Sequence, residues 1–143
     1  MLNLSLGAIL VAAQLVSLGG GGLPQIIEPD YSNVPVGIGR SGEVKLGVKV
    51  RDGYLINRRP AMQLELQTIA GIELADSTLE SSPEDPKSTN EYYVDVPAFT
   101  LRVIPGRAGS FEIPGKLTYF FCSTADGFCS RQVIDVAIPI RAE

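Results

Sequence analysis

The sequence contains no histidine and no tryptophan, and only two of its 143 residues are cysteine. Without histidine, the chain has no serine–histidine–aspartate triad, no cysteine–histidine pair and none of the usual zinc sites. Two cysteines alone do not complete a structural zinc site or hold an iron–sulfur cluster. We therefore expect no metal and no cofactor. The classes that remain are a binding or structural domain, or chemistry carried by the two sulfurs.

Basic residues are also scarce, because 12 Lys and Arg stand against 16 Asp and Glu, for a formal net charge of -4. A mildly acidic domain has no electrostatic reason to bind nucleic acid or an anionic membrane surface. Hydrophobic residues make up 45% of the chain and charged residues 20%, which is typical of a soluble globular protein. The length fits one domain of ordinary size.

The first residues differ from the rest of the chain. Residues 2–18 carry no charge and are mostly apolar, and the glycines of residues 19–22 follow them. This run is shorter than the membrane span of about 20 apolar residues but suits a secretory signal. We interpret residues 1–22 as a signal peptide or apolar leader and expect an exported protein. The alternatives are a retained membrane anchor and an ordinary buried segment. Residues 23–42 are rich in Gly and Pro, which predicts a linker or an irregular leading segment.

From residue 43 onward, apolar and polar residues alternate in short runs, with the period of a half-buried β-strand. The clear runs cover residues 43–51, 62–67, 99–103, 116–121 and 133–140, and weaker candidates cover residues 72–79 and 91–96. Pro139 has no amide hydrogen, so we expect the last strand to lie at a sheet edge or to break there. Six or seven short antiparallel strands around one core indicate an all-β fold. We predict a single immunoglobulin-like antiparallel β-sandwich over residues 43–143.

The two cysteines lie close together in the sequence. Cys122 and Cys129 flank six residues that include the turn pair Asp126-Gly127, and a predicted strand lies on each side. We therefore expect a hairpin loop with one sulfur near each arm, at a separation that suits a disulfide. A structural disulfide here would add about 2.5 kcal/mol on the chain-entropy model. A redox-active pair would instead exchange disulfides with another protein, through an accessible thiolate and a second, resolving sulfur. Both functions remain open from the residues alone.

The sequence around the cysteines is similar to a known family. Residues 115–122, Gly-Lys-Leu-Thr-Tyr-Phe-Phe-Cys, and residues 125–129, Ala-Asp-Gly-Phe-Cys, resemble the active-site hairpin of the N-terminal periplasmic domain of DsbD, the thiol:disulfide interchange protein. Residues 52–57, Asp-Gly-Tyr-Leu-Ile-Asn, resemble that family's Gly-Tyr-His-Ile-Asn signature. Further similar segments follow in the same order, and the resemblance extends over about residues 43–143.

The resemblance implies a specific function. It implies an immunoglobulin-like β-sandwich in the periplasm, with Cys122 and Cys129 as the exchanging pair. Such a domain receives electrons from a membrane-embedded thiol donor and reduces client proteins of the thioredoxin fold. The second cysteine of the hairpin, Cys129, would be the one that bonds to the client's sulfur. The alternative from a different class is a non-catalytic exported binding or assembly domain whose disulfide is purely structural.

The family also shields its sulfurs with a cap loop. The aligned segment here, residues 83–87, contains Glu84 and Asp85 but no aromatic residue. Two acids beside the sulfurs would raise the pKa of the thiols, because their charge repels a thiolate. The alternative is that residues 81–90 form a solvated polar loop. The aromatic residues that we consider for shielding are Tyr92, Tyr93 and Phe128.

Overall fold

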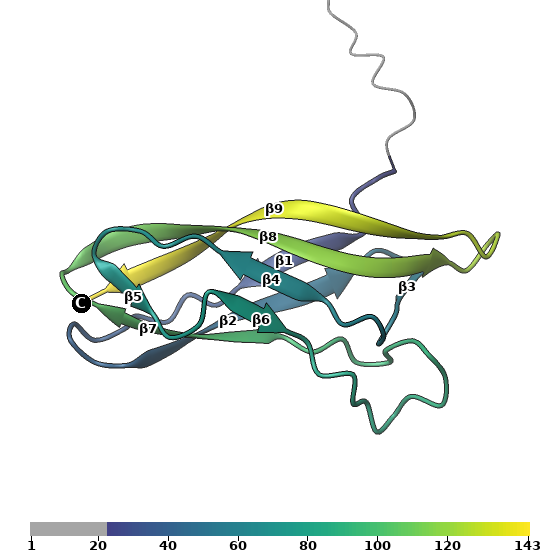
Figure 1. Ribbon diagram of the computed structural model, residues 1–143, viewed down its shortest axis with the longest axis horizontal. Helices are drawn as coiled ribbons and strands as arrows, with labels where there is room; N and C mark the ends of the chain where they lie inside the picture. Colours follow the sequence, from purple (N-terminus) through teal and green to yellow (C-terminus); the bar gives the residue numbers. More distant parts are fainter. Residues whose placement is uncertain (1–22) are drawn as a thin grey trace, which may run out of the picture.

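The alternation of apolar and polar residues produces a structure made of strands. The structure is a computed structural model that describes residues 23–143 (Figure 1). The predicted leader, residues 1–22, lies outside the described residues. Within residues 23–143 there is no helix of the length and apolarity needed to cross a membrane. The strands in this range are β1 (Ile27–Tyr31), β2 (Gly42–Val50), β3 (Tyr54–Ile56), β4 (Gln63–Leu66), β5 (Ile72–Leu74), β6 (Thr78–Glu80), β7 (Phe99–Pro105), β8 (Gly109–Ser123) and β9 (Cys129–Ala142).

These strands form two antiparallel sheets that pack against each other. The first sheet has the order β1-β2-β7-β5. In the second sheet, β9 pairs with β8 along one side, while β3 and β4 pair with successive stretches of the other side and β6 extends the sheet beyond β4. Side chains alternate between buried and exposed along the strands, most regularly in β7. The core contains Leu46, Leu101 and Val103 from the first sheet and Leu64, Leu117 and Ile138 from the second. The prediction of a single all-β sandwich is confirmed.

The leading segment is more regular than its composition predicts. Residues 23–42 were expected to be irregular, but they contain β1, which pairs with β2. Ile26 and Ile27 are fully buried, and their amides donate hydrogen bonds to the Tyr119 hydroxyl at 3.3 and 3.2 Å. Burial of two adjacent isoleucines and this shared acceptor fix the start of β1 against the second sheet.

The two weaker strand candidates also differ from expectation. Residues 72–79 divide into β5 and β6, which belong to different sheets. The chain crosses between the sheets here, because the Ala75 amide bonds to Arg102 in β7, whereas the Ser77 carbonyl accepts from Leu66 at the end of β4. Residues 91–96 form no strand. Their single backbone bridge pairs Tyr92 with Asn57, the residue that follows β3.

β8 and β9 form a long hairpin that is paired along almost its whole length (Figure 1). Within the described residues, β8 is the one strand that pairs with β9, so the predicted edge position of the last strand is confirmed. The strand continues through Pro139. The Ala137 amide donates to the Tyr31 hydroxyl at 3.3 Å and therefore points away from β8. The direction in which backbone N–H groups point repeats every two residues of a strand, so the nitrogen of Pro139 points away from β8 as the Ala137 amide does. The β8–β9 ladder therefore loses no hydrogen bond at Pro139.

The inner face of this hairpin is tightly packed at Gly115. A Cβ at this position would lie 2.9 Å from the Glu65 carbonyl oxygen, closer than real Cβ atoms approach backbone. We expect Gly115→Ala to lower the free energy of unfolding by about 1–3 kcal/mol, because β4 and β8 must move apart. Gly106→Ala is the control, since its Cβ would meet only a carbonyl oxygen at 3.7 Å. Urea unfolding measures both, and equal stabilities would contradict this account of the packing.

Candidate functional site

The disulfide joins the residue pair of β8 and β9 nearest the turn. Cys122 and Cys129 lie opposite each other, with Cα atoms 4.0 Å apart and an S–S bond of 2.01 Å. Pairs with and without hydrogen bonds alternate along an antiparallel ladder. Glu112 and Pro139 form a pair without ladder hydrogen bonds. Cys122 and Cys129 lie ten residues further along the two strands, an even number, so they also form a pair without ladder hydrogen bonds. Cα atoms approach most closely in such pairs. The predicted hairpin with one sulfur on each arm is confirmed.

The two cysteines differ in their exposure to solvent. Cys122 is only 4% exposed, whereas Cys129 is exposed. Both cysteines lie on the outer face of the second sheet. Neighbouring residues of a strand point to opposite faces, and Phe121, next to Cys122 in β8, points into the core. The difference follows from the strand order. Cys122 lies in β8, with β9 on one side and Leu55 of β3 on the other, whereas Cys129 lies on the edge strand.

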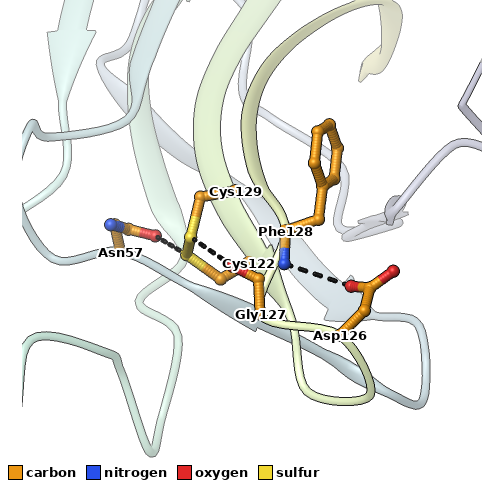
Figure 2. Close-up of a disulfide and its surroundings, with 6 residues drawn as sticks. All are labelled: Asn57, Cys122, Asp126, Gly127, Phe128 and Cys129. Atoms are coloured by element: carbon orange, nitrogen blue, oxygen red, sulfur yellow. Dashed lines mark hydrogen bonds between the residues drawn. A yellow bond between two sulfur atoms is a disulfide. The ribbon is translucent and has the colours of Figure 1, made fainter.

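Asn57 contacts the buried sulfur. Its Oδ1 lies 3.7 Å from Cys122 Sγ (Figure 2), and its backbone amide donates to the Phe120 carbonyl at 2.9 Å, which holds it beside β8. In the disulfide the sulfur has no hydrogen, so the two atoms are only in van der Waals contact. After reduction, the Cys122 thiol can donate a hydrogen bond to this oxygen. This hydrogen bond favours the neutral thiol over the thiolate.

The turn between the sulfurs is held by its own polar groups. The Asp126 carboxylate accepts a hydrogen bond from the Phe128 amide at 3.1 Å, and this bond is the main reason that the pKa of Asp126 lies below its ordinary value. Gly127 has a φ of 70°, in the left-handed region that glycine adopts without strain. The predicted turn at these residues is therefore confirmed. Phe128 is 49% exposed, and Figure 2 shows its ring pointing away from the S–S bond.

Residues 81–95, which we call the cap segment, lie against β3. The Arg58 amide donates to the Glu91 carbonyl at 2.8 Å, and the Tyr93 amide donates to the Ile56 carbonyl at 3.0 Å. These bonds place Tyr92 opposite Asn57, the residue that contacts Cys122. Of the aromatic residues considered for shielding, Tyr92 is thus the one on the same side of the sheet as the disulfide, half-buried and next to Asn57.

Tyr93 has a structural role instead. It is 5% exposed, and its hydroxyl lies 3.2 Å from the Ser81 hydroxyl, which in turn accepts a hydrogen bond from the Met62 amide at 2.9 Å. Successive residues of an extended segment point to opposite sides, so Tyr93 faces the core while Tyr92 faces outward. The Tyr93 ring therefore anchors the cap segment in the core, and the Tyr92 ring is left on the side of the disulfide.

The two acids of the cap segment have different environments. Asp85 is buried, and its carboxylate accepts hydrogen bonds from the amides of Lys87, Val94 and Asp95 at 3.0, 2.7 and 3.0 Å. The bond from Asp95 is the largest of the causes that lower the pKa of Asp85. Glu84 is exposed to solvent. No hydrogen bond in residues 23–143 joins either acid to Cys122 or Cys129, and Asp85 instead folds the cap segment onto itself.

Asn57 is the site residue that sequence reasoning missed. It ends the motif Asp-Gly-Tyr-Leu-Ile-Asn, so the motif itself was a signal, but nothing in its spacing places it beside Cys122. Among the residues that the structure describes, no three His, Cys, Asp or Glu side chains gather where they could hold a metal ion. No family model matches this sequence, and none of the curated proteins is detectably similar to it.

The bonds to Asp85 predict an acid-dependent cap segment. A folded-state pKa below the ordinary value of 3.8 means that the charged carboxylate stabilises the fold. This stabilisation is complete above pH 3.8 and is lost as the pH falls through the lower, folded-state pKa. We expect hydrogen exchange at the Val94 and Asp95 amides to accelerate in that acidic range. Asp85→Asn should remove the acid dependence, and Glu84→Gln, the control at an exposed acid, should leave it unchanged.

The contact between Asn57 and Cys122 gives a second prediction. In a Cys129→Ser background, where Cys122 is the single thiol, we expect Asn57→Asp to raise the pKa of that thiol, because a carboxylate beside the sulfur repels the thiolate. Asn33→Asp, in an exposed loop after β1, makes the same change of charge and should leave the pKa unaltered. The pH dependence of alkylation measures both. Equal pKa values in the two variants would show that Asn57 does not act on the sulfur.

Proposed function

We propose that this chain is an exported thiol–disulfide exchange domain that passes reducing equivalents to client proteins through Cys122 and Cys129. The difference in exposure between the two cysteines is the observation that supports it best. Exchange between proteins needs one sulfur that a partner can reach and a second that completes the reaction within the domain. An exposed Cys129 and a buried Cys122, already close enough to bond, meet both requirements.

The proposed reaction has two displacement steps. The Cys129 thiolate attacks one sulfur of a client disulfide, which forms a mixed disulfide and releases the other client sulfur as a thiolate. Cys122 then loses its proton and attacks Cys129 Sγ, which re-forms the Cys122–Cys129 bond and releases the second client thiolate. Two electrons leave the domain, and the two client thiolates each take up a proton. A dithiol donor must then reduce Cys122–Cys129 by the reverse sequence.

Asn57 and the cap segment fit this order of events. A thiol of Cys122 held in its neutral form by Asn57 does not compete with Cys129 for the client, because the thiolate is the nucleophile. Tyr92, next to Asn57, limits approach from the side of β3. Attack from outside is therefore directed to Cys129, on the edge strand.

The resemblance to the N-terminal domain of DsbD supports the direction of electron flow. On that basis the donor is a membrane-embedded thiol protein, the clients have the thioredoxin fold, and the compartment is the periplasm. The apolar residues 2–18 support export, with a retained membrane anchor as the alternative. These assignments rest on the residues quoted for the resemblance and on the paired cysteines.

The alternative is a non-catalytic binding or assembly domain with a structural disulfide. The extent of the β8–β9 pairing argues against it. Because the two strands are paired along almost their whole length, the other residue pairs of the hairpin set the same register that places the cysteines opposite each other. A disulfide at the end of such a hairpin adds only the modest stabilisation of a short closed loop, about 2.5 kcal/mol.

Single-cysteine variants distinguish the two functions. We expect Cys122→Ser, which keeps the exposed sulfur, to accumulate a mixed disulfide with a thioredoxin-fold client, because the resolving step is lost. Cys129→Ser keeps the buried sulfur and should trap almost none. We also expect a reduction potential above about −250 mV for the wild-type pair. A potential below about −300 mV, or a Cys129→Ser variant that reduces the client as well as wild type does, would assign the disulfide a structural role.

A further inference from the structure

A groove runs along the outer face of the second sheet. It lies over β8, between β4 and β9, and has a volume of about 590 Å³. Its lining includes outward-facing side chains of all three strands, because alternate residues of each strand point to this face. The lining residues on which the argument depends are Glu65, Lys116, Phe120, Arg131 and Val133.

One end of the groove lies next to the disulfide. Phe120 and Arg131 are opposite each other across β8 and β9, and each stands two residues from a cysteine on the same face. Two residues of a strand cover about 7 Å. Consider a client cysteine that is bonded to Cys129 and lies in an extended segment running along the sheet. The client residue two positions from that cysteine then lies over this end of the groove. In an extended segment, that residue points to the same side as the client's cysteine.

The charges at the disulfide end of the groove favour an acidic residue at that position, because the two acids of the lining, Glu65 and Glu80, lie on β4 and β6 and not on β9. At the far end, Lys116 forms an ion pair with Asp135 at 2.9 Å. Arg131 is exposed and forms no salt bridge with any residue of 23–143, and it is the cation nearest in sequence to the exposed sulfur. A guanidinium pairs well with a carboxylate through two parallel hydrogen bonds. The surface around it, half-buried Phe120 and exposed Val133, is apolar.

We infer that this groove binds an extended segment of the client that carries an acidic residue two positions from its reactive cysteine. The carboxylate pairs with Arg131, and an apolar neighbour covers Phe120 and Val133. The inference rests on the proposed exchange function, because the groove positions a client whose sulfur is attacked by Cys129. Arg131 is then a specificity residue, which selects among clients without taking part in the displacement of sulfur.

Synthetic peptides test this inference. Each peptide contains one cysteine, present as a mixed disulfide with mercaptoethanol, and differs only in having Glu or Lys at both positions two residues from that cysteine. The reduced protein is mixed with each peptide, and the second-order rate of peptide reduction is measured. The readout is the ratio of the Glu rate to the Lys rate for each protein, so that a general effect of a substitution on thiol reactivity cancels.

We expect the wild-type protein to reduce the Glu peptide about two to five times faster than the Lys peptide at low ionic strength, the range that an exposed ion pair supplies. The preference should shrink as salt screens the charges. Arg131→Glu should reverse it. Lys45→Glu makes the same change of charge on the outer face of the first sheet and should retain the wild-type ratio.

Other outcomes overturn the inference in distinguishable ways. If the wild type reduces both peptides at the same rate, or if Arg131→Glu keeps the wild-type ratio, the groove does not select acidic segments while the exchange function stands. If the wild type reduces neither peptide, the exchange function fails and the inference fails with it. Concentration-dependent association of the protein that Arg131→Glu abolishes would show that a second copy of the chain occupies the groove.

Discussion

The pairing register between β8 and β9 is the constraint on which the candidate site depends. Side chains alternate between the two faces of a sheet, so a slip of one residue would turn every inward-facing side chain outward. The observed register places Tyr119 and Phe121 in the core. The same register brings Cys122 opposite Cys129 on the outer face. Packing of the core thus sets the geometry of the two sulfurs, although neither belongs to the interior between the sheets.

The short strand β3 makes the two cysteines differ in their exposure to solvent. β3 contains three residues, yet it covers β8 on the side away from β9, pairs Leu55 with Cys122 and carries the chain on to Asn57. The cap segment adds to the same side through Tyr92, while Asp85 and Tyr93 hold it in place. The edge strand has no such cover around Cys129. A difference in exposure between two identical residues therefore arises from the strand order together with the cap segment.

Local patterns predict the strands and the hairpin, but contacts between distant residues decide the site. Alternation predicts residues 43–51 as a strand, and β2 begins and ends within one residue of that range. The turn pair predicts the hairpin between the cysteines. By contrast, β1 depends on the Tyr119 hydroxyl, more than 90 residues away in the sequence. The contact between Asn57 and Cys122 spans 65 residues. Spacing along the chain contains no information about either.

The position of Pro139 has a consequence for behaviour at high concentration. An exposed edge strand as long as β9 is a template on which another molecule can add a strand, and this leads to aggregation. Here the Ala137 amide is occupied by the Tyr31 hydroxyl, Pro139 has no amide hydrogen, and the Arg141 carbonyl accepts from the Val36 amide at 2.8 Å. The end of β9 distant from the sulfurs therefore offers a poor template for strand addition. The edge strand therefore exposes Cys129 at one end while its other end resists self-association.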